Sequence, residues 1–164
     1  MADDRLDHRS RSSARRRSAQ GQRGADAQGL GRSRGGLSTK IHAATEALGL
    51  PIRLIASPGQ RNDIAFAHDL IDGIKADVAI ADKGYDADHL ANRIAEAGTE
   101  VVIPPKRNRK VQRPYDVDLY KERNRIERFF AKLKQFRRVA TRYDKLLVNF
   151  MSFVKLAAIA IWLR

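Results

Sequence analysis

The sequence contains no cysteine, and its four histidines are scattered along 164 residues. Without cysteine the chain has no disulfide, no thiol nucleophile and no cysteine-ligated zinc, and an intracellular compartment becomes the default expectation. The arginines near the N-terminus have no apolar segment behind them, so we expect no secretory signal peptide. These absences predict a cytoplasmic protein whose chemistry uses oxygen and nitrogen side chains.

Long apolar runs are also scarce. The exception, residues 146–163, is about long enough to span a bilayer. Asn149, Ser152 and Lys155 interrupt this run with polar and charged side chains. A helix packed in a protein core therefore explains the run better than a membrane span, and we expect no membrane partner.

Acidic residues are few: 19 Asp and Glu stand against 32 Lys and Arg, which gives a formal net charge of +13. A field of this sign attracts polyanions over distances that salt screening sets. Nucleic acid is therefore the leading partner class. Ribosomal proteins and basic tails share this balance, so charge alone does not separate an enzyme from a scaffold.

The chain divides near residue 36. Residues 1–36 have few large apolar side chains and bury too little surface to offset their ordering entropy, so we expect a disordered basic segment. Residues 37–164 have the length and apolar content of one domain. Alternation and helical spacing predict strands at 37–43, 51–56, 77–82 and 99–104, and helices at 64–74, 86–97, 118–138 and 145–162. This order is a mixed α/β layout that begins with a hairpin.

Asp82 stands at the end of a predicted buried strand, in the segment Ala81-Asp-Lys-Gly-Tyr-Asp86. Carboxylates at strand ends face the crevice in which open α/β sheets bind ligands. An aspartate before a glycine also commonly caps a helix or a turn. The sequence around Asp82 leaves both interpretations open.

One predicted helix carries Tyr120, Arg123, Glu127 and Lys134 at steps of three, four and seven positions. At about 3.6 residues per turn these steps keep the four side chains on one face. A single carboxylate among two cations and a phenol suits a face that meets phosphates and a metal ion. The alternative is ordinary ion pairing, because Arg123 and Glu127 form an i,i+4 pair.

These four residues match one by one the Y-(2)-R-(3)-E-(6)-K signature of a large group of bacterial DDE insertion-sequence transposases. The segment Asp82-Lys-Gly-Tyr85 is similar to that group's second-aspartate segment, and residues 31–42, 57–63 and 132–138 resemble further segments of it. Over roughly residues 24–164, the chain resembles the C-terminal catalytic part of such a transposase.

The resemblance implies a ribonuclease-H-like α/β fold, a mixed sheet with flanking helices, for residues 37–164. It makes Asp82 and Glu127 the second and third catalytic carboxylates, which together with a first aspartate would hold two Mg²⁺ (or Mn²⁺) ions. Hard cations of this kind prefer oxygen ligands, which suits a chain without cysteine. The implied function is DNA strand cleavage and transfer at the ends of an insertion sequence in a bacterial cell.

The resemblance also implies double-stranded DNA as the partner, bound at the nucleoid by a homo-oligomer in a synaptic complex. Tyr120, Arg123 and Lys134 would contact DNA near the cleaved phosphate, since Arg and Lys bind phosphate oxygens directly. The basic loop that follows the last predicted strand would extend this contact along the DNA backbone through Lys106, Arg107 and Arg109. For this loop, a solvated surface without a partner is an equal alternative.

The family's first aspartate normally lies on a strand just before the hairpin, in a segment that reads Ile-Asp-Ser-Thr. Here residues 3–17 are rich in Arg and Ser and show no apolar alternation. Permitted codons for residues 4–9 spell Ile-Asp-Ser-Thr-Ile when read one nucleotide later, so we hypothesise that residues 3–20 are this strand translated in the wrong frame. The first strand and its aspartate would then be missing and catalysis impaired. A non-catalytic DNA-binding remnant of a transposase is the alternative function.

Overall fold

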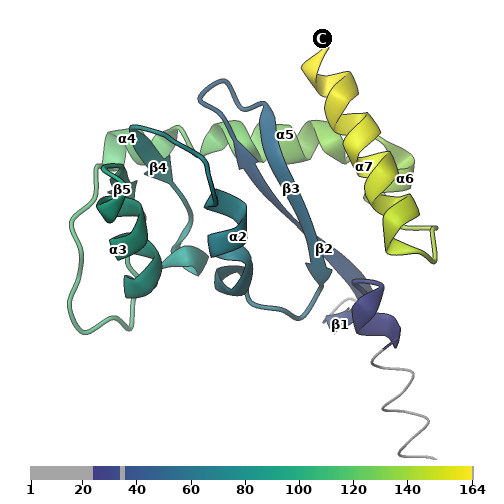
Figure 1. Ribbon diagram of the computed structural model, residues 1–164, viewed down its shortest axis with the longest axis horizontal. Coiled ribbons are helices and arrows are strands. Elements are labelled where there is room, and N and C mark those ends of the chain that lie inside the picture. The colour runs from purple at the N-terminus through teal and green to yellow at the C-terminus, as the bar shows by residue number, and fades with distance from the viewer. Residues whose placement is uncertain (1–23, 34–35, 164) are drawn as a thin grey trace, which may run out of the picture.

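Figure 1 shows the fold in a computed structural model, which describes residues 24–33 and 36–163. The strands are β1 (Gly31–Ser33), β2 (Gly36–Thr45), β3 (Pro51–Pro58), β4 (Val78–Ile80) and β5 (Glu100–Val102). The helices are α2 (Ala67–Ile71), α3 (Asp88–Glu96), α4 (Val117–Lys121), α5 (Asn124–Leu133), α6 (Arg137–Ala140) and α7 (Leu147–Trp162). Two short 3-10 helices are η1 (Asp63–Phe66) and η2 (Lys83–Tyr85). The predicted mixed α/β layout with a leading hairpin is confirmed.

The strands form two sheets in place of the single mixed sheet that the resemblance implies. β1, β2 and β3 are antiparallel neighbours, and β4 pairs with β5 in parallel. Within residues 24–33 and 36–163 no strand bridges β2 and β4, so the two sheets share no hydrogen-bonded ladder. The predicted missing strand and frame shift fall on residues 3–20, which lie outside the described residues.

Residues 31–33, predicted to belong to a disordered segment, form β1, which pairs with the first residues of β2. Two long-range hydrogen bonds hold the turn before β1. Thr39 Oγ1 donates to the Gly29 carbonyl at 2.7 Å, and the Arg142 guanidinium donates to the Gln28 carbonyl at 2.8 Å. Hydrogen bonds to the backbone of residues 24–33 therefore hold this segment in place, although its sequence is poor in large apolar side chains. Composition does not reveal such bonds.

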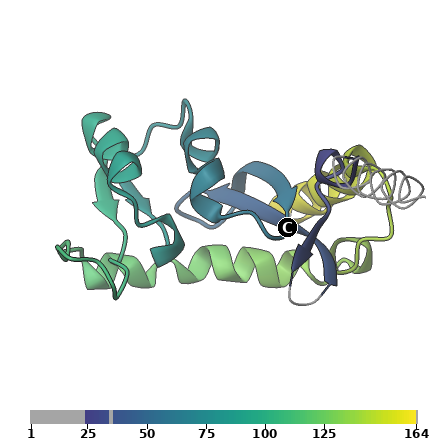
Figure 2. The same cartoon turned by 90° about the horizontal axis from the view of Figure 1, so that it is seen from below.

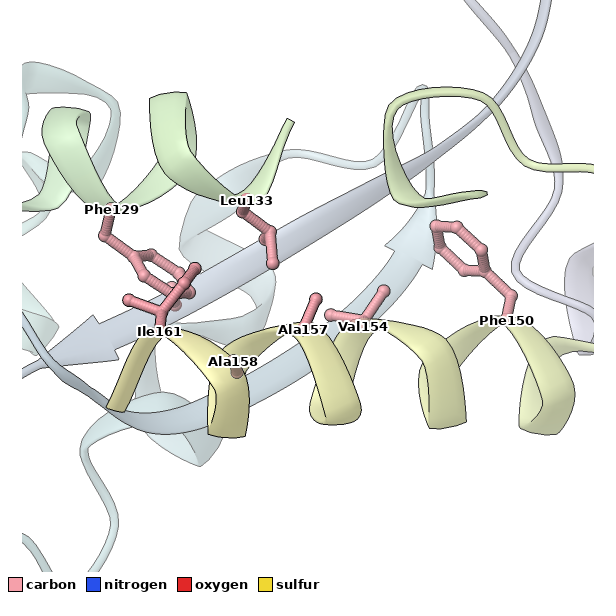
Figure 3. Packing of buried hydrophobic residues seen from close by; sticks show 8 residues of the cluster. Phe129, Leu133, Phe150, Val154, Ala157, Ala158 and Ile161 are labelled. Carbon is pink, nitrogen blue, oxygen red and sulfur yellow. The ribbon is translucent and has the colours of Figure 1, made fainter. Parts of the chain in front are cut away.

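α5 and α7 pack on the β2–β3 hairpin around the larger of two apolar clusters (Figure 3). The hairpin contributes Ala43, α5 contributes Phe129 and Leu133, and one face of α7 includes Phe150 and Val154. The predicted core helix over 145–162 is therefore confirmed as α7. None of the helices in the described ranges combines the length and the apolar character that crossing a membrane requires.

The helix predicted over 118–138 is divided into α4, α5 and α6. Figure 2 shows α4 and α5 following one another along nearly one line. Between them the N–H groups of Arg125 and Ile126 donate to carbonyls three residues back, a tighter turn than an α-helix makes. Beyond α5 the backbone is extended at Phe136, and this partly buried ring packs against the larger cluster. The extended residue separates α6 from α5.

A second apolar cluster lies between α2, α3 and the β4–β5 pair. Its buried members are Ala67, Leu90, Ile94 and Ile103. The Arg53 guanidinium on β3 reaches across and donates to the carbonyls of Asp69, Leu70 and Asp72, in and just after α2. The last carbonyls of a helix have no partner within it. One cation therefore satisfies them and joins the two parts of the fold.

A buried polar pair links the two strands of the hairpin. His42 on β2 and Ser57 on β3 are almost fully buried, and His42 Nε2 lies 2.8 Å from Ser57 Oγ. The other ring nitrogen, Nδ1, faces the Asp63 carboxylate at 3.6 Å. Ser, His and Asp in this order resemble a hydrolase triad, but Ser57 is 1% exposed and out of a substrate's reach. The pair is therefore structural.

The substitution Phe129→Ala should destabilise the larger cluster, because this ring is among the largest fully buried side chains. We expect the free energy of unfolding to fall by about 3–5 kcal/mol, from lost transfer energy and the cavity left behind. Urea unfolding followed by circular dichroism measures the loss. Leu156→Ala on α7, where the side chain is 60% exposed, is the control and should cost less than about 0.5 kcal/mol. Equal losses would contradict the assigned core.

Stability should depend on pH through His42. Burial lowers the pKa of His42, against a smaller raising effect of the Asp63 charge. A histidine with a folded pKa below its ordinary 6.5 stabilises the fold above that pH and loses this contribution as the pH falls below it. We expect the free energy of unfolding to decline from about pH 7 to pH 5.

His42→Gln should be less stable than the unsubstituted protein at neutral pH and should show a shallower decline on acidification. Thermal unfolding across this pH range measures both quantities. Asn92→Gln, at an exposed position on α3 without a titratable group, is the control and should keep the original slope. An unchanged slope in His42→Gln would show that another group causes the pH dependence.

Candidate active site and nucleic-acid interface

Asp82 lies between β4 and the η2 turn. Its backbone is extended, and its carboxylate Oδ1 accepts a hydrogen bond from the Gly84 N–H at 2.7 Å. The side chain therefore sits at the carboxyl end of a strand, as expected, and also caps a turn, as the alternative held. The second oxygen, Oδ2, accepts no hydrogen bond from any residue in the described ranges, which leaves it available to a ligand.

Asp63, the first residue of η1, lies close to Asp82. In the sequence it ends the segment over 57–63 that resembles the family and precedes an apolar helical pattern, but neither signal placed it beside Asp82. A Cβ added to Gly84 would lie 2.8 Å from Asp82 Oδ1 and 3.3 Å from Asp63 Oδ2, so a glycine lets both carboxylates approach this turn. Lys40 Nζ pairs with Asp63 at 3.0 Å. Burial raises the pKa of the Tyr85 phenol, and the charges of Asp63 and Asp82 raise it further. Tyr85 therefore stays protonated beside the two carboxylates.

An open cavity of about 480 Å³ adjoins Asp82. It is lined by residues of η2 and of the basic loop over 106–113, namely Lys83, Gly84, Lys106, Arg107 and Asn108. Three cations and an amide thus surround one carboxylate, a setting that suits an anionic ligand such as a phosphate. The structure therefore brings two of the predicted DNA-binding residues, Lys106 and Arg107, to Asp82.

The basic loop is held by two acidic residues that follow η2. Asp86 Oδ1 accepts hydrogen bonds from Arg109 at 2.9 Å and from Arg113 at 3.2 Å, and Asp88 pairs with both guanidinium groups. The side chain of Arg109 is only 18% exposed. Arg109, which we predicted to contact DNA, therefore has partners inside the protein. The solvated-surface alternative does not describe this part of the loop.

The predicted face on α4 and α5 is partly assembled. Arg123 Nη2 donates to Glu127 Oε1 at 2.6 Å, and the Arg123 guanidinium lies 5.5 Å from the centroid of the Tyr120 ring. The i,i+4 ion pair that the sequence offered as the alternative is thus formed. The side chain of Glu127 is 54% exposed. Lys134 is exposed at the C-terminal end of α5.

Asp82 and Glu127 belong to different parts of the fold. α5, which carries Glu127, packs in the larger apolar cluster, whereas Tyr85 of η2 packs against the second. Residues 24–33 and 36–163 contain no group of three or more His, Asp or Glu that could hold a metal ion. The two-metal site that the resemblance implies has three carboxylates, so the described residues around Asp82 do not complete it. Convergence of Asp82 and Glu127 stays a prediction.

Two bacterial transposases are similar to the chain. A transposase for insertion sequence element IS6501 of Brucella ovis is 45% identical over 132 residues, which cover 78% of this chain and 100% of that protein. A transposase for element IS402 of Burkholderia cepacia is 30% identical over 130 residues, which cover 72% of this chain and 59% of that protein. No solved structure matches the chain.

A family model also matches the chain. The model of the transposase DDE domain covers residues 7–163, nearly the whole sequence. A DDE domain implies a ribonuclease-H-like fold, which agrees with the mixed α/β elements described above. The match and the two relatives confirm the family that the signature residues predicted. The chain therefore belongs to the DDE-domain transposases of bacterial insertion sequences, a family of enzymes.

Proposed function

We propose that the chain binds double-stranded DNA at the ends of an insertion sequence and that the cavity beside Asp82 receives a backbone phosphate. The observation that carries this proposal is the gathering of Lys83, Lys106 and Arg107 around one carboxylate. Arg and Lys bind phosphate oxygens strongly, and a charge of +13 draws the duplex to the protein. The proposed setting is the bacterial nucleoid, with a homo-oligomer in a synaptic complex.

Asp82 and Glu127 are the proposed catalytic carboxylates of strand cleavage and transfer, and the proposed ligands of Mg²⁺ or Mn²⁺. Their match to the family signature supports this assignment. A bound divalent ion would supply the positive charge that lets a phosphate approach a carboxylate. Asp82 contributes an oxygen that accepts no hydrogen bond from the described residues. Because the described donors are incomplete, no reaction step through the metal follows from this arrangement.

Tyr120, Arg123 and Lys134 are proposed to extend the DNA contact along α4 and α5. Arg123 is paired with Glu127 before DNA arrives. Exposed ion pairs contribute only about 0–1 kcal/mol, so a phosphate can compete for this guanidinium. Release of Glu127 from Arg123 would also free its carboxylate for the role that the family signature gives it.

We further propose that the family's first aspartate is missing from this chain and that its catalysis is therefore impaired. A two-metal site without one of its carboxylates binds its ions weakly. The coding DNA tests the cause: codons for residues 4–9 that forbid Ile-Asp-Ser-Thr one nucleotide later end the frame-shift hypothesis. A DNA-binding transposase remnant without catalysis is the second candidate function.

Arg107→Gln tests the cavity as the DNA site. We expect binding of a labelled duplex to weaken about tenfold and the slope of log affinity against log salt to fall by about 1, because one phosphate contact is lost. Fluorescence anisotropy over a series of salt concentrations measures both. Lys155→Gln removes the same charge at an exposed position on α7 and should have a much smaller effect. Equal effects would mean that only net charge matters.

A Mg²⁺-dependent nicking assay on a duplex with the insertion-sequence end separates the two candidate functions. We expect weak nicking, because two of the three carboxylates remain, and its loss in both Asp82→Asn and Glu127→Ala. Glu96→Ala changes an exposed acidic residue on α3 and is the matched control. Binding without any nicking would favour the remnant, and nicking that survives both substitutions would refute the assigned carboxylates.

A further inference from the structure

Asp86 carries a buried charge that the proposed reaction does not use. Its side chain is 2% exposed, and no other acidic residue is buried in the part of the chain that the structure describes. A carboxylate out of water is unfavourable unless hydrogen-bond donors surround it. Asp86 ends the η2 turn that begins at Asp82, so groups that bind Asp86 lie close to the cavity beside Asp82.

The donors to the Asp86 carboxylate come from the basic loop over 106–113. Oδ2 accepts from the Lys106 backbone N–H at 2.8 Å, and Oδ1 accepts from Arg109 at 2.9 Å and from Arg113 at 3.2 Å. Lys106 Nζ donates to the Asp86 backbone carbonyl at 3.2 Å. One acidic residue therefore anchors the loop at its start, its middle and its end.

The cations of the loop face two directions. The side chains of Arg109 and Arg113 turn inward, 18% and 28% exposed, where Asp88 also pairs with both. Arg107 is exposed and lines the cavity together with Lys106. The loop thus uses two arginines to hold itself in place and presents other cations to a ligand beside Asp82.

We propose that Asp86 is a positioning residue for the DNA-binding cavity: it fixes the basic loop so that Lys106 and Arg107 stand beside Asp82. In this arrangement Arg109 and Arg113 anchor the loop and do not contact DNA. The inference rests on the proposed function, in which the cavity receives a phosphate. It gives Arg109 an indirect role in place of the phosphate contact predicted from the sequence.

Charge and entropy both make such an anchor useful. Like charges that are held close together repel one another. The loop contains five cations, namely Lys106, Arg107, Arg109, Lys110 and Arg113. The two carboxylates of Asp86 and Asp88 offset this repulsion. A loop that is already ordered also spares the entropy that binding would otherwise lose in fixing it.

Asp86→Asn tests the proposal, because two explanations predict opposite signs. Removal of a negative charge should strengthen DNA binding if net charge alone decides the affinity. Loss of the loop anchor should weaken binding, and we expect a loss of about tenfold. Fluorescence anisotropy with a labelled random-sequence duplex measures the affinity. Asp72→Asn is the matched control, since it removes the same charge from an exposed ion pair with Arg93 and should leave binding equal or tighter.

The order of the loop gives a readout that needs no DNA. Trypsin cuts after Lys and Arg, and the anchored loop should resist it. In Asp86→Asn we expect the rate of cleavage within the loop to rise about tenfold, because the anchor no longer keeps the loop closed. Tighter DNA binding by Asp86→Asn, or a loop that stays protected in it, would overturn the proposal. Should Asp86→Asn fail to fold, Arg109→Gln and Arg113→Gln remove the same anchor from the side of the loop. For them trypsin cleavage at the remaining Lys and Arg decides, because loss of a cation weakens DNA binding under both explanations, and a loop that stays protected would overturn the proposal.

Arg109→Gln separates anchoring from direct contact. If Arg109 acts as an anchor, Arg109→Gln should weaken DNA binding in the original protein and have no further effect in the Asp86→Asn variant. If Arg109 contacts a phosphate directly, Arg109→Gln should weaken DNA binding in both. Arg107→Gln reports on the proposed function itself. If it leaves DNA binding unchanged, the cavity is not the DNA site and both proposals fail. If it weakens binding while Asp86→Asn does not, only the positioning role fails.

Discussion

A carboxylate that is 2% exposed has to be surrounded by donors, and at Asp86 this requirement organises the candidate site. The first donor, the Lys106 N–H, lies 20 positions further along the chain, so meeting the charge also brings the basic loop onto the η2 turn. The cavity beside Asp82 follows from this contact, since η2 and the loop form its lining. Charge pairing, more than apolar burial, shapes this face of the molecule.

Apolar burial instead divides the molecule into two clusters, and the proposed catalytic carboxylates stand on either side of that division. α5 and α7 pack on the hairpin, while α2 and α3 pack on β4 and β5. Arg53 and Asp63 provide polar links between the parts. β4 pairs with β5 alone in the described ranges, so its other edge carries no ladder there. The distance between Asp82 and Glu127 therefore depends on how firmly the two clusters are joined.

Intramolecular carboxylates engage many of the cations around the site. Asp86 and Asp88 hold two arginines of the loop, Glu127 holds Arg123, and Asp63 holds Lys40. A chain with a charge of +13 would otherwise attract polyanions over its whole surface. Pairing leaves a smaller set of cations, Lys106 and Arg107 among them, to meet a phosphate at one place. Localised recognition is thus compatible with a strongly basic composition.

From residue 37 on, the sequence alone predicted most of the helices and strands and the place of Asp82 at a strand end, and it offered the pairing of Arg123 with Glu127 as an alternative, because each depends on neighbours within a few positions. It missed β1 and the division of the helix over 118–138, which depend on contacts with distant segments. It did not reveal that Asp63 approaches Asp82, that Asp86 anchors the basic loop, or that the strands form two sheets. Those features join segments distant in the chain. Only packing in three dimensions decides which distant groups meet, since periodicity reports the exposed and buried sides of one element and carries no information about its partner.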